Sequence, residues 1–196
     1  MAIEVDGDWH EADGGSHRHD AVLLDTFQTL LGSAGIARRD VREAVVVNGP
    51  GSFTGLRISV SFIHALDSVS PLKVLPLDQL SLIASLQPKA IQAVLDARMD
   101  EVYVGRDLSS RGLFKTLEVL PLESMQWDAN TVCHTDELDR FAGCVSSRPS
   151  LLDLRALAAQ QPLSGWVSGS QLVPQYVRHS VSWKPLSEQP SKLYDR

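Results

Sequence analysis

The sequence predicts an α/β protein of two lobes, with parallel strands at the centre of the first lobe. Two observations favour this class. Strand-like and helix-like segments alternate through the first 88 residues, an order that is typical of parallel sheets. Strand-rich sequence then resumes after Pro88. We therefore expect an N-terminal lobe over residues 1–88, which holds a glycine-rich loop and its helix, and a smaller C-terminal lobe over residues 89–196.

The first lobe is expected to contain a hairpin followed by alternating helices and strands. An Asp-Gly pair at residues 6 and 7 accepts the positive φ angles of a two-residue turn. Asp20 is suited to cap a helix that ends at Gly35, and Pro71 closes the next helix. The apolar positions after residue 55 fit either a strand or a helix, and the glycine-rich loop before them favours a helix. The predicted elements are a hairpin over residues 2–13, helices over 20–35, 56–66 and 80–87, and strands over 44–47 and 73–75.

The second lobe is expected to be a smaller α/β lobe that ends in a closing tail. A three-residue turn at residues 98–100 joins two strand-like runs into a second hairpin, and Pro162 stops the last helix. The predicted elements are strands over residues 90–97, 101–107, 113–120 and 131–133, one or two helical turns over 137–141, and a helix over 151–161.

Composition narrows the class of protein. The 196 residues are 43% hydrophobic and 21% charged, which is typical of folded proteins, and 24 acidic against 18 basic residues give a net charge of −6. No basic stripe is present, which argues against nucleic-acid binding driven by charge alone. No apolar run reaches the roughly 18 residues that a membrane span needs, and the first ten residues lack the pattern of a signal peptide. We expect a soluble protein that remains in the cytoplasm.

The glycine-rich loop over residues 48–55 is the most informative local feature. Glycines between a strand and a helix let the backbone approach a phosphate, and the helix N-terminus supplies N–H donors. However, Thr54 stands where a dinucleotide fingerprint needs glycine, and Leu56 stands where a Walker A loop needs lysine. The residues alone leave a structural turn and a phosphate site open, and they favour the turn.

Three other groups of residues have a chemical and a structural interpretation. The run His17-Arg18-His19-Asp20 contains metal-ligand types but is more typical of a polar loop before a helix. Asp96, Asp100 and Glu101 could form a paired-carboxylate acid/base site at a strand end, although acidic residues at a hairpin turn are usually solvated. Cys133 lies in an apolar run and is expected to be a buried small side chain. Two cysteines are too few for a disulfide framework or a four-thiolate zinc site.

Four segments resemble one known family. The loop and helix start Gly-Pro-Gly-Ser-Phe-Thr-Gly-Leu-Arg-Ile at residues 49–58 closely resemble the signature of the TsaB family, also called YeaZ. The helix after His19-Asp20, the Asp-Ala-Arg-Met-Asp-Glu-Val-Tyr run at residues 96–103, and the Pro-Gln-Tyr-Val-Arg and Val-Ser-Trp-Lys runs at 174–178 and 181–184 follow in the family's order. The resemblance implies the fold shared by actin, Hsp70 and sugar kinases.

The resemblance further implies a partner protein without independent enzymatic activity. TsaB proteins support transfer of a threonylcarbamoyl group to N6 of adenosine 37 in tRNAs that read codons beginning with A. They bind the catalytic subunit TsaD, the ATPase TsaE completes the set, and tRNA is met only through the complex. The expected TsaD interface, which is also a surface for self-association, comprises Ser52, Phe53, Thr54, Leu56, Arg57, Val60 and Ile63. Gly49, Gly51 and Gly55 would be the nucleotide-proximal loop. No catalytic residue, no metal and no cofactor are expected in the isolated chain, with ATP or ADP confined to the interface of the complex.

Two departures from the family pattern are visible. The family begins with a strand that carries an Asp-Thr-Ser element, and no such stretch precedes Ala2 here, so one strand of the first lobe is expected to be missing and its neighbour to have unpaired backbone groups. Residues 128–165 also depart from the pattern, which predicts a reduced second lobe.

Three alternatives remain beside the scaffold hypothesis. A small phosphotransferase or ATPase would use the glycine loop and would bind nucleotide as an isolated chain. A peptidase is suggested by descriptions of distant relatives. A degenerate paralogue would only self-associate.

Overall fold

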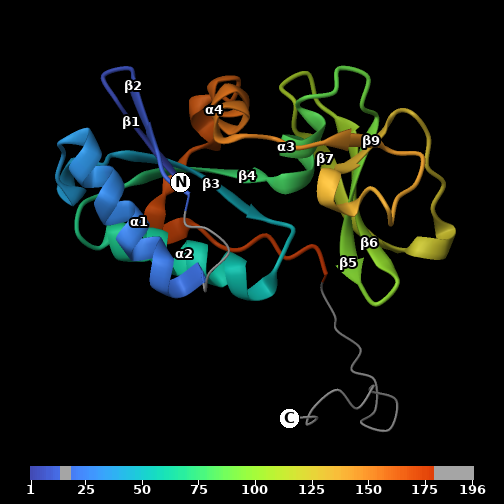
Figure 1. Ribbon diagram of the computed structural model, residues 1–196, viewed down its shortest axis with the longest axis horizontal. Helices are drawn as coiled ribbons and strands as arrows, with labels where there is room; N and C mark the ends of the chain where they lie inside the picture. Colours follow the sequence, from blue (N-terminus) through green and yellow to red (C-terminus); the bar gives the residue numbers. More distant parts are fainter. Residues whose placement is uncertain (14–18, 179–196) are drawn as a thin grey trace, which may run out of the picture.

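The computed structural model describes residues 1–13 and 19–178 and contains two main sheets, a separate hairpin and four helices (Figure 1). The strands are β1 (Ala2–Val5), β2 (Asp8–Glu11), β3 (Glu43–Gly49), β4 (Lys73–Asp78), β5 (Gln92–Arg98), β6 (Glu101–Leu108), β7 (Phe114–Pro121), β8 (Thr131–His134), β9 (Val145–Ser147) and β10 (Val167–Ser168). The helices are α1 (His19–Ala34), α2 (Phe53–Asp67), α3 (Gln79–Ala84) and α4 (Leu151–Ala159).

The hairpin predicted at the start of the chain is present. β1 and β2 pair antiparallel, with Val5 opposite Asp8. Asp6 and Gly7 between them both have positive φ angles, 51° and 92°, as the Asp-Gly pair indicated. Arg155 of α4 forms an ion pair with Glu4, and its guanidinium lies 5.9 Å from the centre of the Trp9 ring. The hairpin is thus fastened to a helix from the other end of the chain.

The first sheet has the order β10-β4-β3, and β3 and β4 are parallel as predicted. Alternate residues of β3 pack into different clusters. Ala44 and Val46 face the cluster built by α1 and α2, whereas Val45 and Val47 face the cluster that contains residues of α4. Helices therefore cover both faces of this sheet, with α1 and α2 on one side and α4 on the other (Figure 1).

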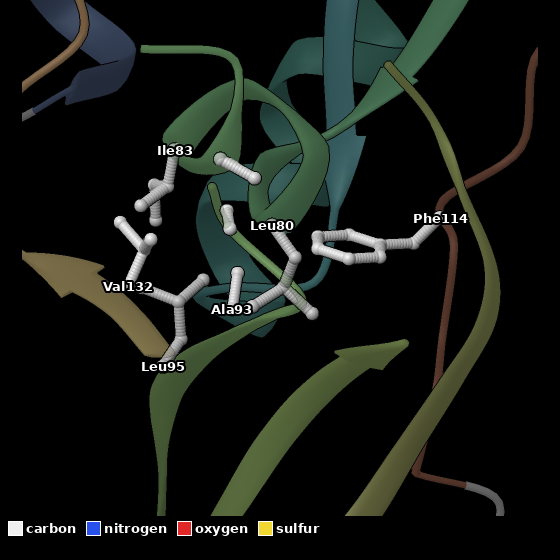
Figure 2. Packing of buried hydrophobic residues seen from close by; sticks show 8 residues of the cluster. Leu80, Ile83, Ala93, Leu95, Phe114 and Val132 are labelled. Carbon is white, nitrogen blue, oxygen red and sulfur yellow. The ribbon is translucent and has the colours of Figure 1, made fainter. Parts of the chain in front are cut away.

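The second sheet has the order β7-β6-β5-β8-β9. Antiparallel pairing joins β5, β6 and β7, and parallel pairing joins β5, β8 and β9. Figure 2 shows Leu80 and Ile83 of α3 packed against Ala93, Leu95 and Val132 of the sheet, with Phe114 beside Leu80. Residues of α3 are almost fully buried, so this short helix joins the two sheets.

Several predicted boundaries are wrong. Asp20 lies inside α1, which starts at His19, so it is not the N-cap. Helix α2 starts at Phe53, three residues earlier than predicted. Strand β4 continues through Pro76 to Asp78. Where helical turns were expected over residues 137–141, the structure has a 3-10 turn that starts two residues earlier, at Thr135–Glu137. The short strand β9 was not predicted.

The chain returns to the first sheet after β9. β10 pairs with β4, and Leu157 and Ala158 of α4 pack against Leu75 and Leu77. The proposed boundary at residue 88 separates the two sheets, but the segment after residue 150 lies with the first one. We therefore propose a first lobe of residues 1–88 and 151–178 and a second lobe of residues 89–150. None of the described helices is long and apolar enough to cross a membrane.

Candidate interaction surface beside the glycine loop

The glycine loop is shorter than the sequence suggested. The Ser52 hydroxyl caps α2 by accepting a hydrogen bond from the Gly55 N–H at 3.4 Å, and Leu56 N–H donates to Ser52 O at 2.9 Å. A serine cap satisfies one of the free N–H groups at a helix start. Phe53, Thr54 and Gly55 therefore form the first helical turn, and the loop proper comprises only residues 49–52.

A segment from the C-terminal part of the chain lies directly on this loop. We call residues 172–178 the strap. The Asn48 side chain donates to Val173 O at 3.1 Å, and Gln175 N–H donates to Asn48 O at 2.8 Å. A Cβ atom at Gly49 would lie 2.5 Å from Gln175 O, and the φ angle of Gly49 is 144°. The close approach that this glycine permits is therefore to the protein's own backbone.

The other two glycines of the predicted nucleotide-proximal loop have ordinary surroundings. A Cβ atom at Gly51 would lie 3.4 Å from the side chain of Gln79, and one at Gly55 would contact the side chain of Ser52. Among the loop glycines, only Gly49 has a backbone conformation that other residues rarely adopt.

A buried carboxylate lies beside the loop at the end of the neighbouring strand. Asp78 is paired in register with Gly49, and its Oδ1 accepts a hydrogen bond from Ser81 N–H at 2.7 Å, which caps α3. Burial raises the pKa of Asp78, and hydrogen bonds from Ser81 partly oppose this rise. The carboxylate thus has a structural role at a helix start.

A groove opens between α1 and α2 next to the loop. Its volume is about 550 Å³, and it is lined by Leu23, Phe53, Thr54, Arg57, Ile58, Ser61 and Phe62. Thr54, Ile58 and Ser61 are spaced by four and three residues along α2, so they lie on one face of the helix. The groove therefore combines an apolar lining with small polar side chains on an accessible helix face.

Phe53 is the most prominent side chain at the end of this groove. It is 57% exposed and stacks on Tyr176 of the strap, with ring centroids 5.4 Å apart and planes 26° apart. The guanidinium of Arg57 lies 5.2 Å from the centre of the Phe53 ring, on the next turn of α2. Such aromatic and cation–π contacts hold large side chains in fixed positions at a surface.

The predicted interface residues divide into two groups. Ser52, Phe53, Thr54 and Arg57 are exposed, and Leu56 is half-buried. Val60 and Ile63 are only 6% and 5% exposed and belong to the core beneath α2. The expectation that Val60 and Ile63 lie at an interface is therefore corrected, because an apolar stripe at this spacing faces the sheet.

The groove also contains residues that the sequence pattern did not single out. Leu23, Ile58, Ser61 and Phe62 line it, and Tyr176 stacks beside it. The helical spacing of Thr54, Ile58 and Ser61 could have indicated that these three side chains share one face of α2. Nothing in the local sequence indicated the contact of Tyr176, which is 123 positions from Phe53 and reaches it only in the folded chain.

The acidic residues at the β5–β6 turn do not form an acid/base pair. Asp96 is paired with Arg98 and Arg140, at 3.3 Å and 3.4 Å, and Glu101 is paired with Arg178. Asp100 is exposed. Glu137 accepts a hydrogen bond from Asp96 N–H at 2.9 Å, and burial raises the pKa of the Glu137 carboxyl. Asp96, Glu101 and Glu137 are thus engaged with arginines and backbone donors.

His17 and Arg18 lie outside the described residues. Within residues 1–13 and 19–178, no group of three or more His, Cys, Asp and Glu side chains is arranged to hold a metal ion. Cys133 is buried as expected. Burial raises the pKa of the neighbouring Cys144 thiol to about 12.

Comparison with known proteins assigns the chain to a family. Residues 2–131 match the family model described as "TsaD: tRNA N6-adenosine threonylcarbamoyltransferase". The chain belongs to the TsaB/YeaZ family. Its fold is therefore of the actin-like ATPase type, as the resemblance implied.

Individual TsaB and YeaZ proteins are similar over most of their length. The protein from Haemophilus influenzae named "tRNA threonylcarbamoyladenosine biosynthesis protein TsaB" is 24% identical, over 86% of this chain and 83% of that protein. The Escherichia coli protein of the same name is 27% identical, over 86% and 84%. A crystal structure of "an uncharacterized protein with similarity to peptidase YEAZ" from Pseudomonas aeruginosa has a TM-score of 0.70 at 28% identity, covering 90% of this chain and 93% of its own. A second structure, "YeaZ from Pseudomonas aeruginosa", has a TM-score of 0.67.

Proposed function

We propose that this protein takes part in threonylcarbamoyladenosine formation on tRNA as a non-catalytic scaffold subunit. It binds the transferase TsaD through the groove between α1 and α2 and stabilises TsaD in its working arrangement. TsaE and tRNA bind only to the assembled complex, and the tRNA is modified in the cytoplasm. The names of the related TsaB proteins support the pathway.

The groove is the observation that carries this proposal. A helix of a partner protein can lay its apolar face into a groove of this kind, because residues three and four apart on two helices interlock. Leu23, Ile58 and Phe62 offer the apolar contacts, while Thr54 and Ser61 let a partner helix approach closely. Phe53, held by Tyr176 and Arg57, is suited to fill a pocket on the partner.

The strap favours this role over that of a phosphotransferase. A phosphate bound at the glycine loop would need close access to its backbone N–H groups. Gln175 occupies the approach to Gly49, and Asp78 nearby is engaged as a helix cap. The glycine loop is therefore better suited to supporting the start of α2 than to holding a nucleotide.

The test is co-purification of this protein with TsaD from the same organism. The variant Ser61→Arg places a long charged side chain in the middle of the groove. We expect it to weaken the complex by at least about tenfold, because the arginine would be buried without a partner. Binding is measured by titration of the purified proteins, and modification of tRNA is measured in the reconstituted system. Ser124→Arg, at an exposed serine of the second lobe, is the matched control.

The outcomes separate the alternatives. A Ser61→Arg protein that binds TsaD as tightly as the Ser124→Arg control would contradict the groove as the interface. Dimerisation through the groove with no binding to TsaD would favour the self-associating paralogue. Binding of ATP by the isolated chain at micromolar concentration would favour the phosphotransferase.

A further inference from the structure

A second cavity lies where the two lobes meet, and it shares no lining residue with the α1–α2 groove. Its volume is about 300 Å³. Its walls come from β4 of the first sheet, from the connection between β6 and β7 of the second sheet, and from the segment that follows α4. We call it the junction cavity. Sites for small molecules are frequent where two units of a fold meet, and about 300 Å³ is the lower end of their size range.

Specific contacts hold the β6–β7 connection against the end of α4. Gln161 Nε2 donates to Arg111 O at 2.8 Å and to Leu157 O at 3.0 Å. A Cβ atom at Gly112, whose φ angle is 77°, would lie 3.0 Å from Leu157 Cδ1, so the connection packs closely on the helix. Two walls of the junction cavity are therefore fixed relative to each other by the fold itself.

Hydrogen-bond donors are prominent among the polar side chains that line the junction cavity. Ser109 Oγ accepts a hydrogen bond from Leu113 N–H at 3.1 Å, so the hydrogen of its hydroxyl group can be donated to a ligand. The hydroxyl groups of Ser110 and Ser164 and the guanidinium of Arg111 are further donors. An arginine fork together with hydroxyl groups suits an anion with two or more oxygen atoms.

The charge of the junction cavity points the same way. None of its lining residues is Asp or Glu. Within residues 1–13 and 19–178, Arg111 forms no ion pair, whereas each of the other four arginines of the second lobe pairs with a carboxylate: Arg98, Arg106, Arg140 and Arg148. Arg111 is therefore an uncompensated positive charge on a chain whose net charge is −6.

The rest of the lining is apolar. Leu75 and Pro76 of β4, Leu113 and Pro162 contribute it, and Leu75 is only 2% exposed. An apolar wall beside a few polar groups is the usual composition of a small-molecule site, in which the polar groups fix the orientation of the ligand. A bare inorganic anion would leave this wall without a contact, so the lining favours an organic ligand.

We propose that the junction cavity binds a small organic molecule with a carboxylate or phosphate group. The oxyanion binds Arg111 and the serine hydroxyl groups, and the apolar part of the molecule packs on Leu75 and Pro76. Because the walls belong to both lobes, the bound molecule links the lobes and stabilises the folded chain by mass action. No residue of the proposed TsaD interface takes part, so this inference stands or falls independently of the proposed function.

The test is an NMR titration of the full chain with three simple probes: benzoate, phenyl phosphate and benzamide. Benzamide has nearly the shape of benzoate but carries no charge. Each probe is added to about 20 mM, since molecules of this size commonly bind in the millimolar range. We expect at least one of the two anions to shift the backbone amide signals of residues 109–113 and 163–165, and benzamide to bind at least about tenfold more weakly than that anion. The anion that binds more tightly identifies the group that the cavity prefers.

Two variants assign the binding to the junction cavity. Arg111→Gln should weaken binding of the preferred anion by about tenfold or more, because it removes the positive charge. Arg39→Gln is the matched control, since Arg39 is also exposed, forms no ion pair with a described residue and lies outside the cavity. Ser164→Tyr fills the cavity and should abolish the shifts even if Arg111→Gln lowers the melting temperature.

Three results would overturn the proposal. The first is that neither anion shifts the signals of residues 109–113 and 163–165. The second is that benzamide binds as tightly as the preferred anion, since the site would then recognise only the apolar ring. The third is that both Arg111→Gln and Ser164→Tyr bind the preferred anion as Arg39→Gln does, which would place the binding elsewhere on the chain.

Discussion

Gly49 lies where the strap crosses the end of β3, and it is the residue of the glycine loop with the strictest requirement. Its φ angle is 144°, and a Cβ atom on it would come within 2.5 Å of Gln175 O, which leaves no room for a side chain. We expect Gly49→Ala to lower the free energy of unfolding by about 2 kcal/mol or more, since both backbone strain and a backbone clash arise. Urea denaturation measures the loss. Gly51→Ala is the matched control, and equal midpoints for the two variants would contradict the expected clash.

Two aspartates at helix starts should respond to pH in opposite ways. Burial raises the pKa of Asp78 above its ordinary value of 3.8. The folded protein therefore favours the protonated form of this carboxyl group more than the unfolded chain does. Hydrogen bonds from Ser150 lower the pKa of Asp153, so its contribution is present above pH 3.8 and is lost as the pH falls further. Each replacement by alanine should cost about 1 kcal/mol near pH 7 through loss of a cap.

The costs of the two alanine replacements should change differently between pH 7 and pH 4. The cost of Asp78→Ala should grow as the pH falls through the raised pKa of Asp78, because the wild-type side chain loses its charge penalty there. The cost of Asp153→Ala should stay constant over that range and shrink below it. Differences in unfolding free energy between each variant and the wild type measure both trends. A cost of Asp78→Ala that falls on acidification would show that the charged form is the favoured one.

At the scale of elements, local sequence patterns predicted the turns and helix ends that neighbouring residues determine. The Asp-Gly pair at residues 6 and 7 predicted the hairpin correctly. Gly35, with a φ angle of 66°, directly follows the last residue of α1, as the sequence predicted. The burial of Val60 and Ile63 also follows from local sequence, because apolar residues at helical spacing face a core. The family resemblance had instead placed both residues at an interface, and the packing of α2 on its sheet shows that the helical spacing was the better guide.

Other features of the site depend on residues far apart in the sequence. Phe53 meets Tyr176, Asn48 meets Gln175, and Glu101 meets Arg178 only when the chain returns after β9. No periodicity or turn signal encodes such a return. The segment 172–178 has no regular secondary structure, so its close packing on the glycine loop could not be predicted from local patterns.

At the scale of the whole molecule, the strap joins the two sheets. In the first lobe, His64 Nε2 lies 2.9 Å from Leu172 O of the strap, and the Asn48 side chain donates to Val173 O. In the second lobe, Arg178 of the strap donates to Ala97 O. Arg178 is a mostly buried side chain that binds a carbonyl, a carboxylate and a thioether of one turn. Together with the buried helix α3, Arg178 near the end of the described chain therefore links the two sheets.

This arrangement predicts a specific effect of Arg178→Ala. We expect unfolding free energy to fall by about 1–2 kcal/mol, less than for a fully buried ion pair because Glu101 is partly exposed. Amide hydrogen exchange at residues 98–101 should accelerate, since the turn loses the group that holds its left-handed residues. Arg155→Ala also removes an ion pair between distant parts of the chain, but Arg155 is half-exposed, so it should cost less than about 1 kcal/mol and leave exchange at this turn unchanged. Equal exchange at residues 98–101 in the two variants would mean that the turn is stable without the strap.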